Sequence, residues 1–579
     1  MADFGDRFVN LAHRIGISDE APLPVEDLSV PFLEAVDHLL GLVPQGGGTI
    51  YLRPGRWRLG GAVLVSVPPT ITLMVAPGAL IVPLPPEGRF ARSDVVHRPS
   101  VQILGGLEAP TSMFLSTSVY EGFFVSVDDP AGAVPDAGWV SLPTAAVTAV
   151  YPDWWGGGRF PGIKGAMVDH ASCEAALRGA LFRWEWTETG GDRAPSSPLV
   201  IEVRSRLRLS EPLRLGERTW SFDGDSGSTP QTFSMSGLLL RGRRRDEPSL
   251  SGLATRSGRG RFLLEFTAPK GLRIEDLHLD TGTNFSGVVD IDLGEGNGER
   301  ELTFSGCTFS GACDNLVAVR AATAPTVPPT EGSPSSGASD VAFSACVWRP
   351  SPIEARPGVG LRVAAPYRTV TVRDANLVGE ARRMIQFDGG SLRVDVCSFH
   401  NAAVPGEWYA TDPKLRPPVP ESGVDIDVSW LLAPPGRLWA SACNSASLQF
   451  LARERLYRPT KIFLSGLAPC NAVITALQHR MDAPAVAPTP PSRPTFPASI
   501  FWTTSLDATS TLTFLAGRLD PGPTNNPFRG RVAVDELGQQ SIYDAWLLPA
   551  GTRYSVWRYG TLVRVYSLGY RVIWGDVTI

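Results

Sequence analysis

Apolar and polar residues alternate in a short phrase that recurs along the middle of the chain. Its clearest copies are Leu302–Phe309, Val341–Trp348 and Leu392–Phe399, and its weaker copies are Leu272–Leu279, Val370–Leu377 and Leu438–Cys443. In each copy the first, third and sixth positions are apolar, whereas the second and fourth are mostly polar. The first three positions have the period of two that is typical of a strand with one buried face. The step from the third to the sixth position predicts a bend that turns the following residues inward.

The spacing of these copies predicts how the strands are arranged. Successive copies start 30, 39, 29, 22 and 46 residues apart. A constant phrase at irregular intervals is expected of stacked coils whose loops differ in length. The pattern therefore predicts an all-β fold, a solenoid of parallel strands whose outward side chains form one long, shallow sheet.

Cysteines occupy one particular position of the phrase. Cys307, Cys346, Cys397 and Cys443 are each its sixth residue, which we expect to point into the coil. Cysteine behaves as a small apolar residue in such an interior column. Because the chain has no Cys-x-x-Cys pair, we expect buried free thiols, with no metal site and no disulfide.

Three amphipathic segments predict helices that cover the open end of a strand stack, where backbone groups lack partners. A short helix is predicted from the spacing of Phe4, Phe8, Leu11 and Ile15. A second helix begins near Pro31 and ends before Pro44. A third covers about 173–184, with Asp169 or Ser172 as its N-cap.

Three stretches of sequence resemble a known superfamily. They are Gly46-Gly-Gly-Thr-Ile-Tyr-Leu-Arg-Pro-Gly-Arg-Trp57, Ala76-Pro-Gly-Ala-Leu80 and Tyr151-Pro-Asp-Trp-Trp-Gly156. They are similar to segments of the pectin-lyase-like proteins, which include phage tailspikes, polygalacturonases and polysaccharide lyases. The resemblance covers residues 30–480 and implies a right-handed parallel β-helix with N-terminal capping helices. One departure is the absence of the usual Asp-Asp-Thr run before the capping helix.

These patterns divide the chain into five parts. Residues 1–29 are an N-terminal amphipathic or docking segment, 30–150 a small β-helix-like domain with its capping helix, and 151–481 the main parallel β-helix. Residues 482–499 contain six prolines and are predicted to be a linker. Alternating stretches in 500–579 predict a small, antiparallel C-terminal β domain.

Composition excludes several classes of partner. Lys and Arg total 53 and Asp and Glu total 58, so no basic footprint for nucleic acid is expected. The chain has no apolar run near 20 residues, so no membrane span is expected. Its first residues lack a basic stretch followed by an apolar one, so no secretory signal is expected. We therefore expect a location outside the cell on a particle or cell surface, reached without a signal peptide, or otherwise in the cytoplasm.

Candidate chemistry lies on a second strand family between the copies of the cysteine phrase. Alternation places two columns of side chains outward, and neighbouring coils stand about 4.8 Å apart. The first column is Asp290, Ala318, Arg362, Gln386 and Asp425, and the second is Asp292, Arg320, Ala364, Asp388 and Asp427. Trp408 and Tyr409 belong to a loop that could overhang this face and stack on a sugar ring.

Three interpretations of these columns stay open. A glycan hydrolase would use two carboxylates, Asp388 with Asp427 or Asp292. A polysaccharide lyase would use Arg320 or Arg362 to neutralise a uronate, with Asp290 or Asp292 binding calcium. In the third, alternating charges only keep an exposed sheet soluble. The polygalacturonase motifs Gly-His-Gly and Arg-Ile-Lys are absent, and the seven histidines lack metal-ligand spacing, so no cofactor is predicted.

Our hypothesis from the sequence is a particle- or surface-associated protein, similar to a tailspike or fibre, that recognises polysaccharide. Asp290, Arg320, Arg362, Gln386, Asp425, Trp408 and Tyr409 would then bind the glycan. The alternatives are the two enzymes and a structural subunit of a larger assembly. The resemblance to tailspikes implies a homotrimer and partners among the proteins of a phage-like particle.

Overall fold

The fold is known from a computed structural model of the 579-residue chain. It describes residues 7–42, 46–60, 63–84, 95–96, 101–109, 140–141, 149–158, 161–181, 200–222, 231–242, 249–253, 258–282, 285–294, 300–321, 339–351, 358–381 and 383–401. Beyond residue 401 it describes strand backbone alone, in 436–441, 444–448, 460–464, 470–475, 478–482, 501–503, 511–515, 518–520, 533–534, 540–541, 553–558, 561–567 and 572–574.

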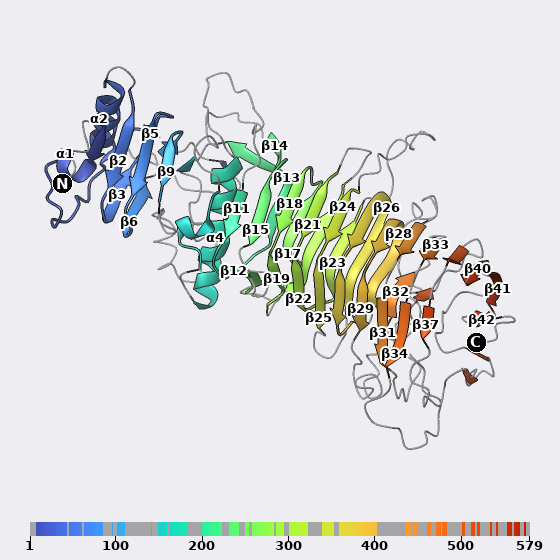
Figure 1. Ribbon diagram of the computed structural model, residues 1–579. Helices are drawn as coiled ribbons and strands as arrows, with labels where there is room; N and C mark the ends of the chain where they lie inside the picture. Colours follow the sequence, from blue (N-terminus) through green and yellow to red (C-terminus); the bar gives the residue numbers. More distant parts are fainter. Residues whose placement is uncertain are drawn as a thin grey trace. The chain divides into compact units, whose positions relative to one another are not determined.

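The chain forms two compact units. Unit 1 comprises Met1–Ser257 and Lys270–Leu277, and unit 2 comprises Gly258–Pro269 and His278–Ile579. Both are built from short parallel strands of neighbouring coils, as the recurring phrase predicts (Figure 1). The fold is thus the predicted parallel β-helix.

Unit 1 begins with a small strand stack and one covering helix. Its helix α2 (Ser29–Leu40) confirms the predicted helix at Pro31 and buries Phe32, Val36 and Leu39 (Figure 1). The strands are β1 (Phe8–Asn10), β2 (Gly48–Leu52), β3 (Gly55–Leu59), β4 (Val65–Val67), β5 (Ile71–Val75), β6 (Ala79–Pro83), β8 (Val101–Ile103), β9 (Gly106–Glu108) and β10 (Val140–Ser141). Three parallel sheets result, in the orders β1-β2-β5-β9, β3-β6 and β10-β8-β4.

The prediction of a helix through Phe4, Phe8, Leu11 and Ile15 is wrong at Phe8. Phe8 begins strand β1, which pairs in parallel with β2, and only α1 (Leu11–Arg14) is helical. The edge of β2 offers unpaired backbone groups, and a strand satisfies them better than a helix would. The segment therefore extends a sheet of its own unit.

The helix predicted at 173–184 starts earlier. Helix α4 spans Gly162–Leu181 and follows the short 3-10 helix η1 (Pro152–Trp155). The predicted N-caps Asp169 and Ser172 therefore lie inside the helix and are buried. Asp169 instead accepts hydrogen bonds from the backbone N–H of Gly158 (2.7 Å, Oδ1), in the turn after η1, and of Arg208 (2.7 Å, Oδ2), in the strand 207–209.

The remaining strands of unit 1 continue the coils next to α4. They are β7 (Val95–Val96), β11 (Val200–Val203), β12 (Leu207–Leu209), β13 (Leu213–Phe222), β14 (Gln231–Ser234), β15 (Leu239–Gly242), β16 (Leu250–Gly252) and β18 (Leu272–Glu275). Parallel pairs β11–β15, β15–β18 and β12–β16 repeat the coil. The antiparallel pair β13–β14 leaves this pattern as a hairpin.

Unit 2 contains three parallel strand families. The first runs through β17 (Gly258–Thr267), β20 (Phe285–Asp292), β23 (Asn315–Arg320), β26 (Val359–Arg373), β28 (Arg383–Asp395), β32 (Thr460–Leu464) and β35 (Phe501–Thr503). The second, which carries the cysteine phrase, runs through β21 (Leu302–Ser305), β24 (Val341–Ser344), the second halves of β26 and β28, β30 (Gly436–Ser441), β33 (Cys470–Thr475), β36 (Thr511–Leu515) and β40 (Arg553–Arg558).

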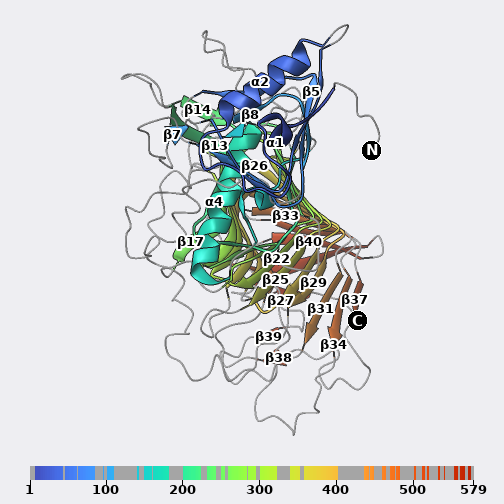
Figure 2. The same cartoon turned by 90° about the vertical axis from the view of Figure 1, so that its left-hand side faces the viewer.

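The third family forms a separate sheet. It contains β19 (His278–Asp280), β22 (Thr308–Ala312), β25 (Val347–Ser351), β27 (Asn376–Gly379), β29 (Ser398–Asn401), β31 (Asn444–Leu448), β34 (Gln478–Asp482) and β37 (Arg518–Asp520). Figure 2 shows β22, β25, β27, β29 and β31 in succession. Each coil therefore contributes one strand to each family.

The bend between the second and third families has a repeated backbone conformation. The residue before each predicted cysteine position has a positive φ: 64° at Gly306, 52° at Ala345, 51° at Asp374 and 53° at Val396. The left-handed conformation reverses the side-chain alternation, so the next residue points into the coil. It is strained for residues other than glycine, and most of all for a β-branched valine.

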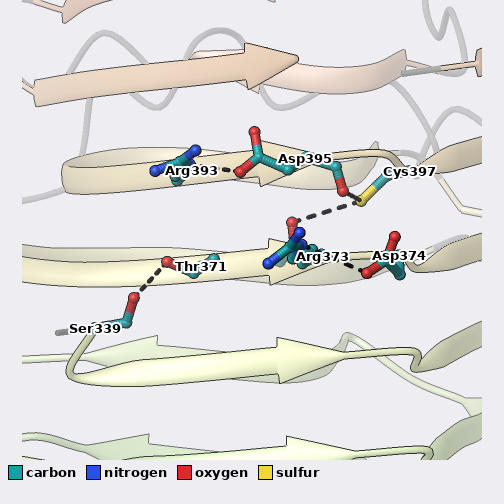
Figure 3. Close-up of polar contacts among 8 residues, drawn as sticks. Ser339, Thr371, Arg373, Asp374, Arg393, Asp395 and Cys397 are labelled. Carbon is teal, nitrogen blue, oxygen red and sulfur yellow. Dashed lines mark hydrogen bonds and ion pairs between the residues drawn. The ribbon is translucent and has the colours of Figure 1, made fainter. Parts of the chain in front are cut away.

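The predicted interior position of the cysteines is confirmed for those that the structure describes. Cys307, Cys346 and Cys397 are buried free thiols, whereas Cys443 lies outside the described residues. Figure 3 shows the Sγ of Cys397 between two backbone carbonyls. It lies 3.3 Å from the carbonyl oxygen of Asp395, two residues earlier in the same coil, and 3.6 Å from that of Val372 in the neighbouring coil. Ala375 takes the equivalent place in the coil between Cys346 and Cys397.

The predicted boundary at 482–499 does not end the parallel stack. Strands β35, β36 and β37, beyond that segment, pair in parallel with β32, β33 and β34, before it. Antiparallel pairing appears in β40, β41 (Thr561–Ser567) and β42 (Val572–Trp574), and between β38 (Ala533–Val534) and β39 (Gln540–Ser541).

Among the helices that the structure describes, none is both long and apolar enough to cross a bilayer.

Candidate functional site

The two outward columns are assembled in unit 2 much as predicted. Backbone pairing aligns Glu265, Asp290, Ala318, Arg362 and Gln386 on successive strands β17, β20, β23, β26 and β28. The second column aligns Thr267, Asp292, Arg320 and Ala364 in the same way. Residues between them, such as Ile291, Val319 and Val363, are buried in the coil. The alternation therefore places these polar side chains on one face.

Asp388 departs from its predicted column. The register shifts by one residue after Val363, so that Ala364 pairs with Gly389 instead. Gly389 and Gly390 have φ of 150° and 100°, a conformation that glycine adopts easily and that suits a β-bulge. The prediction that Asp388 is an exposed member of this column is wrong, because its side chain is fully buried, with 0% exposed.

The buried Asp388 carboxylate holds Arg362 in place. Arg362 donates from Nε to Oδ2 of Asp388 at 2.7 Å, and Gln386 donates from Nε2 to Oδ1 at 2.9 Å. Gln386 is itself buried, whereas the Arg362 side chain is 42% exposed. Among the described residues, no hydrogen bond engages the terminal amino groups of Arg362. The guanidinium is thus fixed at its base and keeps donors for a ligand.

Arg320 bridges two carboxylates one coil away. It donates from Nε to Oδ1 of Asp290 at 3.1 Å and from its terminal nitrogen NH2 to Oδ2 of Asp290 at 2.9 Å. The same NH2 lies 3.5 Å from Oδ2 of Asp292. Burial raises the pKa of the Asp290 carboxyl, and its hydrogen bonds with Arg320 oppose that rise without cancelling it. Asp292 is more exposed, and its Oδ1 accepts a hydrogen bond from the N–H of Gly294.

Small residues separate the two arginines. Arg320 and Ala364 face each other across β23 and β26, and so do Ala318 and Arg362, which gives a diagonal arrangement of arginine and alanine. Diagonal neighbours on adjacent strands are about 7–8 Å apart. Each arginine is therefore paired with a small residue on the neighbouring strand.

Sequence reasoning missed Glu265 of β17, which lies next to Asp290. Its strand has the same alternation, with Leu264 and Phe266 buried on either side of it. The signal was therefore present one coil before the first strand that we assigned to this family.

Four predicted site residues, Asp425, Asp427, Trp408 and Tyr409, lie outside the described residues. The strand expected beside Asp388 was 424–428. In the structure the neighbour of β28 on that side is β32, with Gln386 paired to Phe463. Both edges of this part of β28 pair with other strands, β26 and β32, and Asp427 lies outside the described residues, so the carboxylate pair of Asp388 and Asp427 stays a prediction.

The described side chains form no group of three or more His, Cys, Asp or Glu that could hold a metal ion. The lyase interpretation expected calcium at Asp290 or Asp292, and in the structure the Arg320 guanidinium contacts both carboxylates. The patch formed by Glu265, Asp290, Asp292, Arg320, Arg362 and Gln386, hereafter the outer patch, therefore offers hydrogen-bond donors and acceptors but no cation cage.

No protein-family model and no curated protein sequence matches this chain. Among solved structures it is similar to the A-module of the mannuronan C-5 epimerase AlgE4 of Azotobacter vinelandii, with 10% identity and a TM-score of 0.25 over 90% of this chain and 98% of the other. For DFA-IIIase of Arthrobacter chlorophenolicus A6 in complex with DFA-III the identity is 10% and the TM-score 0.27, over 95% and 93% of the chains. For ORF18 of Geobacillus virus E2 they are 10% and 0.21, over 98% and 69%.

Proposed function

We propose that the protein binds a polysaccharide along the outer patch, as a tailspike- or fibre-like component of a particle or cell surface. The observation that carries this proposal is the way in which the Arg362 side chain is held. Its Nε is held by the buried Asp388, its side chain is partly exposed, and the residue paired with it on β23 is the small Ala318. A long, flat face with fixed donors suits a long polymer, because successive sugars can bind along it without a deep pocket.

The arrangement also limits the cost of binding. A flexible arginine loses rotamer freedom when it binds a ligand, which commonly costs about 0.5–1.5 kcal/mol per side chain. Arg362 and Arg320 have already lost part of that freedom to Asp388 and Asp290. The carboxylates therefore act as positioning groups for the guanidinium donors.

Binding to a panel of polysaccharides tests the proposal. We expect Arg362→Ala to weaken binding of the recognised glycan at least tenfold. Arg349→Ala is the matched control, because Arg349 is an exposed arginine of β25 in the third strand family of the same unit. Wild-type protein that binds no glycan, or equal affinity in Arg362→Ala and wild type, would contradict the proposal.

One observation favours a glycoside hydrolase as a second candidate. The Oδ2 atoms of Asp290 and Asp292 lie 2.9 and 3.5 Å from the same nitrogen of Arg320, so they are close together. Retaining glycosidases place two carboxyls about 5 Å apart, one with a raised pKa as the acid. Burial raises the pKa of Asp290, whereas Asp292 is more exposed. The pair would act with Asp290 as acid and Asp292 as nucleophile.

Reducing-end release and absorbance of unsaturated uronates separate the enzymes from a binding protein. A hydrolase releases reducing ends without that absorbance, and both Asp290→Asn and Asp292→Asn should abolish the release. Absence of product from every glycan that binds would leave recognition alone. A structural subunit would instead bind no glycan and would self-associate, and sedimentation would also test the homotrimer implied by the resemblance.

A further inference from the structure

The outer patch carries more negative than positive charge. Its strands β20, β23 and β26 carry the carboxylates of Asp290 and Asp292 and the guanidinium groups of Arg320 and Arg362. Glu265 on β17 adds a third carboxylate close enough to act on the charge of Arg320. A ligand on this face therefore meets more carboxylate than guanidinium charge.

The positive charges are also already matched. Arg362 forms an ion pair with Asp388 at 2.7 Å, and Arg320 forms one with Asp290 at 2.9 Å. An acidic polymer would have to approach two arginines whose charges are compensated, and it would pass Asp292, whose side chain is 34% exposed. Like charges that meet without compensation oppose binding.

A neutral glycan has no such difficulty. Its hydroxyl groups donate to the carboxylate oxygens of Asp292 and accept from the N–H groups of Arg320 and Arg362, so both kinds of partner are used. The alanines at 318 and 364 leave room for the apolar faces of sugar rings between them. We propose that the polysaccharide recognised by the outer patch is uncharged, and not a polyuronate. This inference rests on the proposed function and names its class of ligand.

Equilibrium binding to neutral and acidic polymers at two salt concentrations tests the inference. The probes are dextran, galactomannan, β-glucan and inulin on one side and polygalacturonate on the other, at 20 and 300 mM NaCl. We expect at least one neutral polymer to bind at least tenfold more tightly than polygalacturonate. The affinity for that neutral polymer should differ less than twofold between the two salt concentrations. Dissolved salt screens only interactions between charges, over a Debye length of about 10 Å at 0.1 M.

A charge reversal sharpens the test. Asp292→Lys should raise the affinity for polygalacturonate at least tenfold at 20 mM NaCl, and this gain should shrink at 300 mM. Asp374→Asn is the matched control, since Asp374 is an exposed aspartate beside Arg373, in the turn after β26 (Figure 3). It should leave all affinities as in the wild type.

Each other result has a distinct meaning. Polygalacturonate binding that exceeds every neutral polymer and weakens with salt would overturn the neutral class but leave polysaccharide recognition standing. An Asp292→Lys protein without any gain for polygalacturonate would overturn the charge argument. Failure of the wild type to bind any of the five polymers would contradict both this inference and the proposed function. The other two results would leave the proposed function standing.

Discussion

The Nε–H of Arg362 on β26 donates to Oδ2 of Asp388 on β28 across 2.7 Å, and the Asp388 side chain is fully buried. This contact joins a buried carboxylate to a partly exposed guanidinium. A carboxylate placed away from water requires compensation, which Arg362 and the amide of Gln386 provide. The same contact that stabilises the bulge therefore orients the guanidinium of the outer patch.

Removal of the Asp388 carboxylate should destabilise unit 2. Asp388→Ala removes an acceptor of the buried amide of Gln386 and the counter-ion of Arg362. Loss of one partner of a buried pair costs about 3–5 kcal/mol, and we expect about 2–3 because Arg362 is partly exposed. Urea unfolding of the full chain measures the change. Asp292→Asn, at a more exposed carboxylate, should cost less than about 1 kcal/mol, and equal losses in the two variants would contradict the role given to burial.

Val396 should be replaceable by glycine with a gain in stability. Its φ is 53°, and its side chain is exposed, so glycine relieves strain at this bend without removing core packing. The left-handed conformation costs about 1–2 kcal/mol per residue for an L-amino acid, and we expect Val396→Gly to raise the unfolding free energy by about 1 kcal/mol. Gly306→Val, at the same bend of another coil, should lower it. A destabilised Val396→Gly protein would show that backbone freedom in the unfolded chain outweighs the strain.

Charge introduced into the cysteine column should prevent folding. Cys346 is fully buried, and in Cys346→Arg a guanidinium would lie there without a partner. We expect this variant to be insoluble or unfolded by circular dichroism. Cys346→Ala is the control, because Ala375 fills the equivalent position of the next coil, and it should cost only about 1 kcal/mol. A soluble Cys346→Arg protein of normal stability would contradict the inward position.

Asp169 should give the stability a pH dependence of unusual sign for an aspartate. Burial raises its pKa to about 6, against the two backbone hydrogen bonds that it accepts. The folded chain therefore keeps the proton up to about pH 6, while the unfolded chain releases it near pH 4. In this window the folded state binds more protons, so the unfolding free energy falls as pH rises, by on the order of 3 kcal/mol in all.

The comparison with Asp169→Asn isolates this contribution. The asparagine cannot titrate, so the unfolding free energy of the variant should lack that decrease between pH 4 and 6.5. His170 and other titrating groups contribute the same pH dependence to both proteins. Urea unfolding at pH 4, 5 and 6.5 measures the two curves. Parallel curves would show that Asp169 titrates alike in the folded and unfolded chains.

Much of this protein could be read from its sequence because the information is local. The period-two phrase identified the strands around Leu302, Val341 and Leu392 and the interior cysteines. The same alternation, in the strands between its copies, identified the outward column from Asp290 to Gln386. Alternation and burial act on neighbouring residues of one strand, so a single copy of the phrase carries them. The signal from Glu265 was of the same kind and was overlooked.

Tertiary structure decided the features that depend on which strands meet. Phe8 forms a strand because the edge of β2 lacks a partner, and β28 pairs with β32 rather than with 424–428 because coil pairing does not follow loop length. The bulge at Gly389 displaced Asp388 from its column by a single residue, which changed an expected surface carboxylate into the buried counter-ion of Arg362. Sequence by itself determined the repeating strand and its two faces. The register between coils, set by backbone hydrogen bonds that no local pattern encodes, determined which side chains meet.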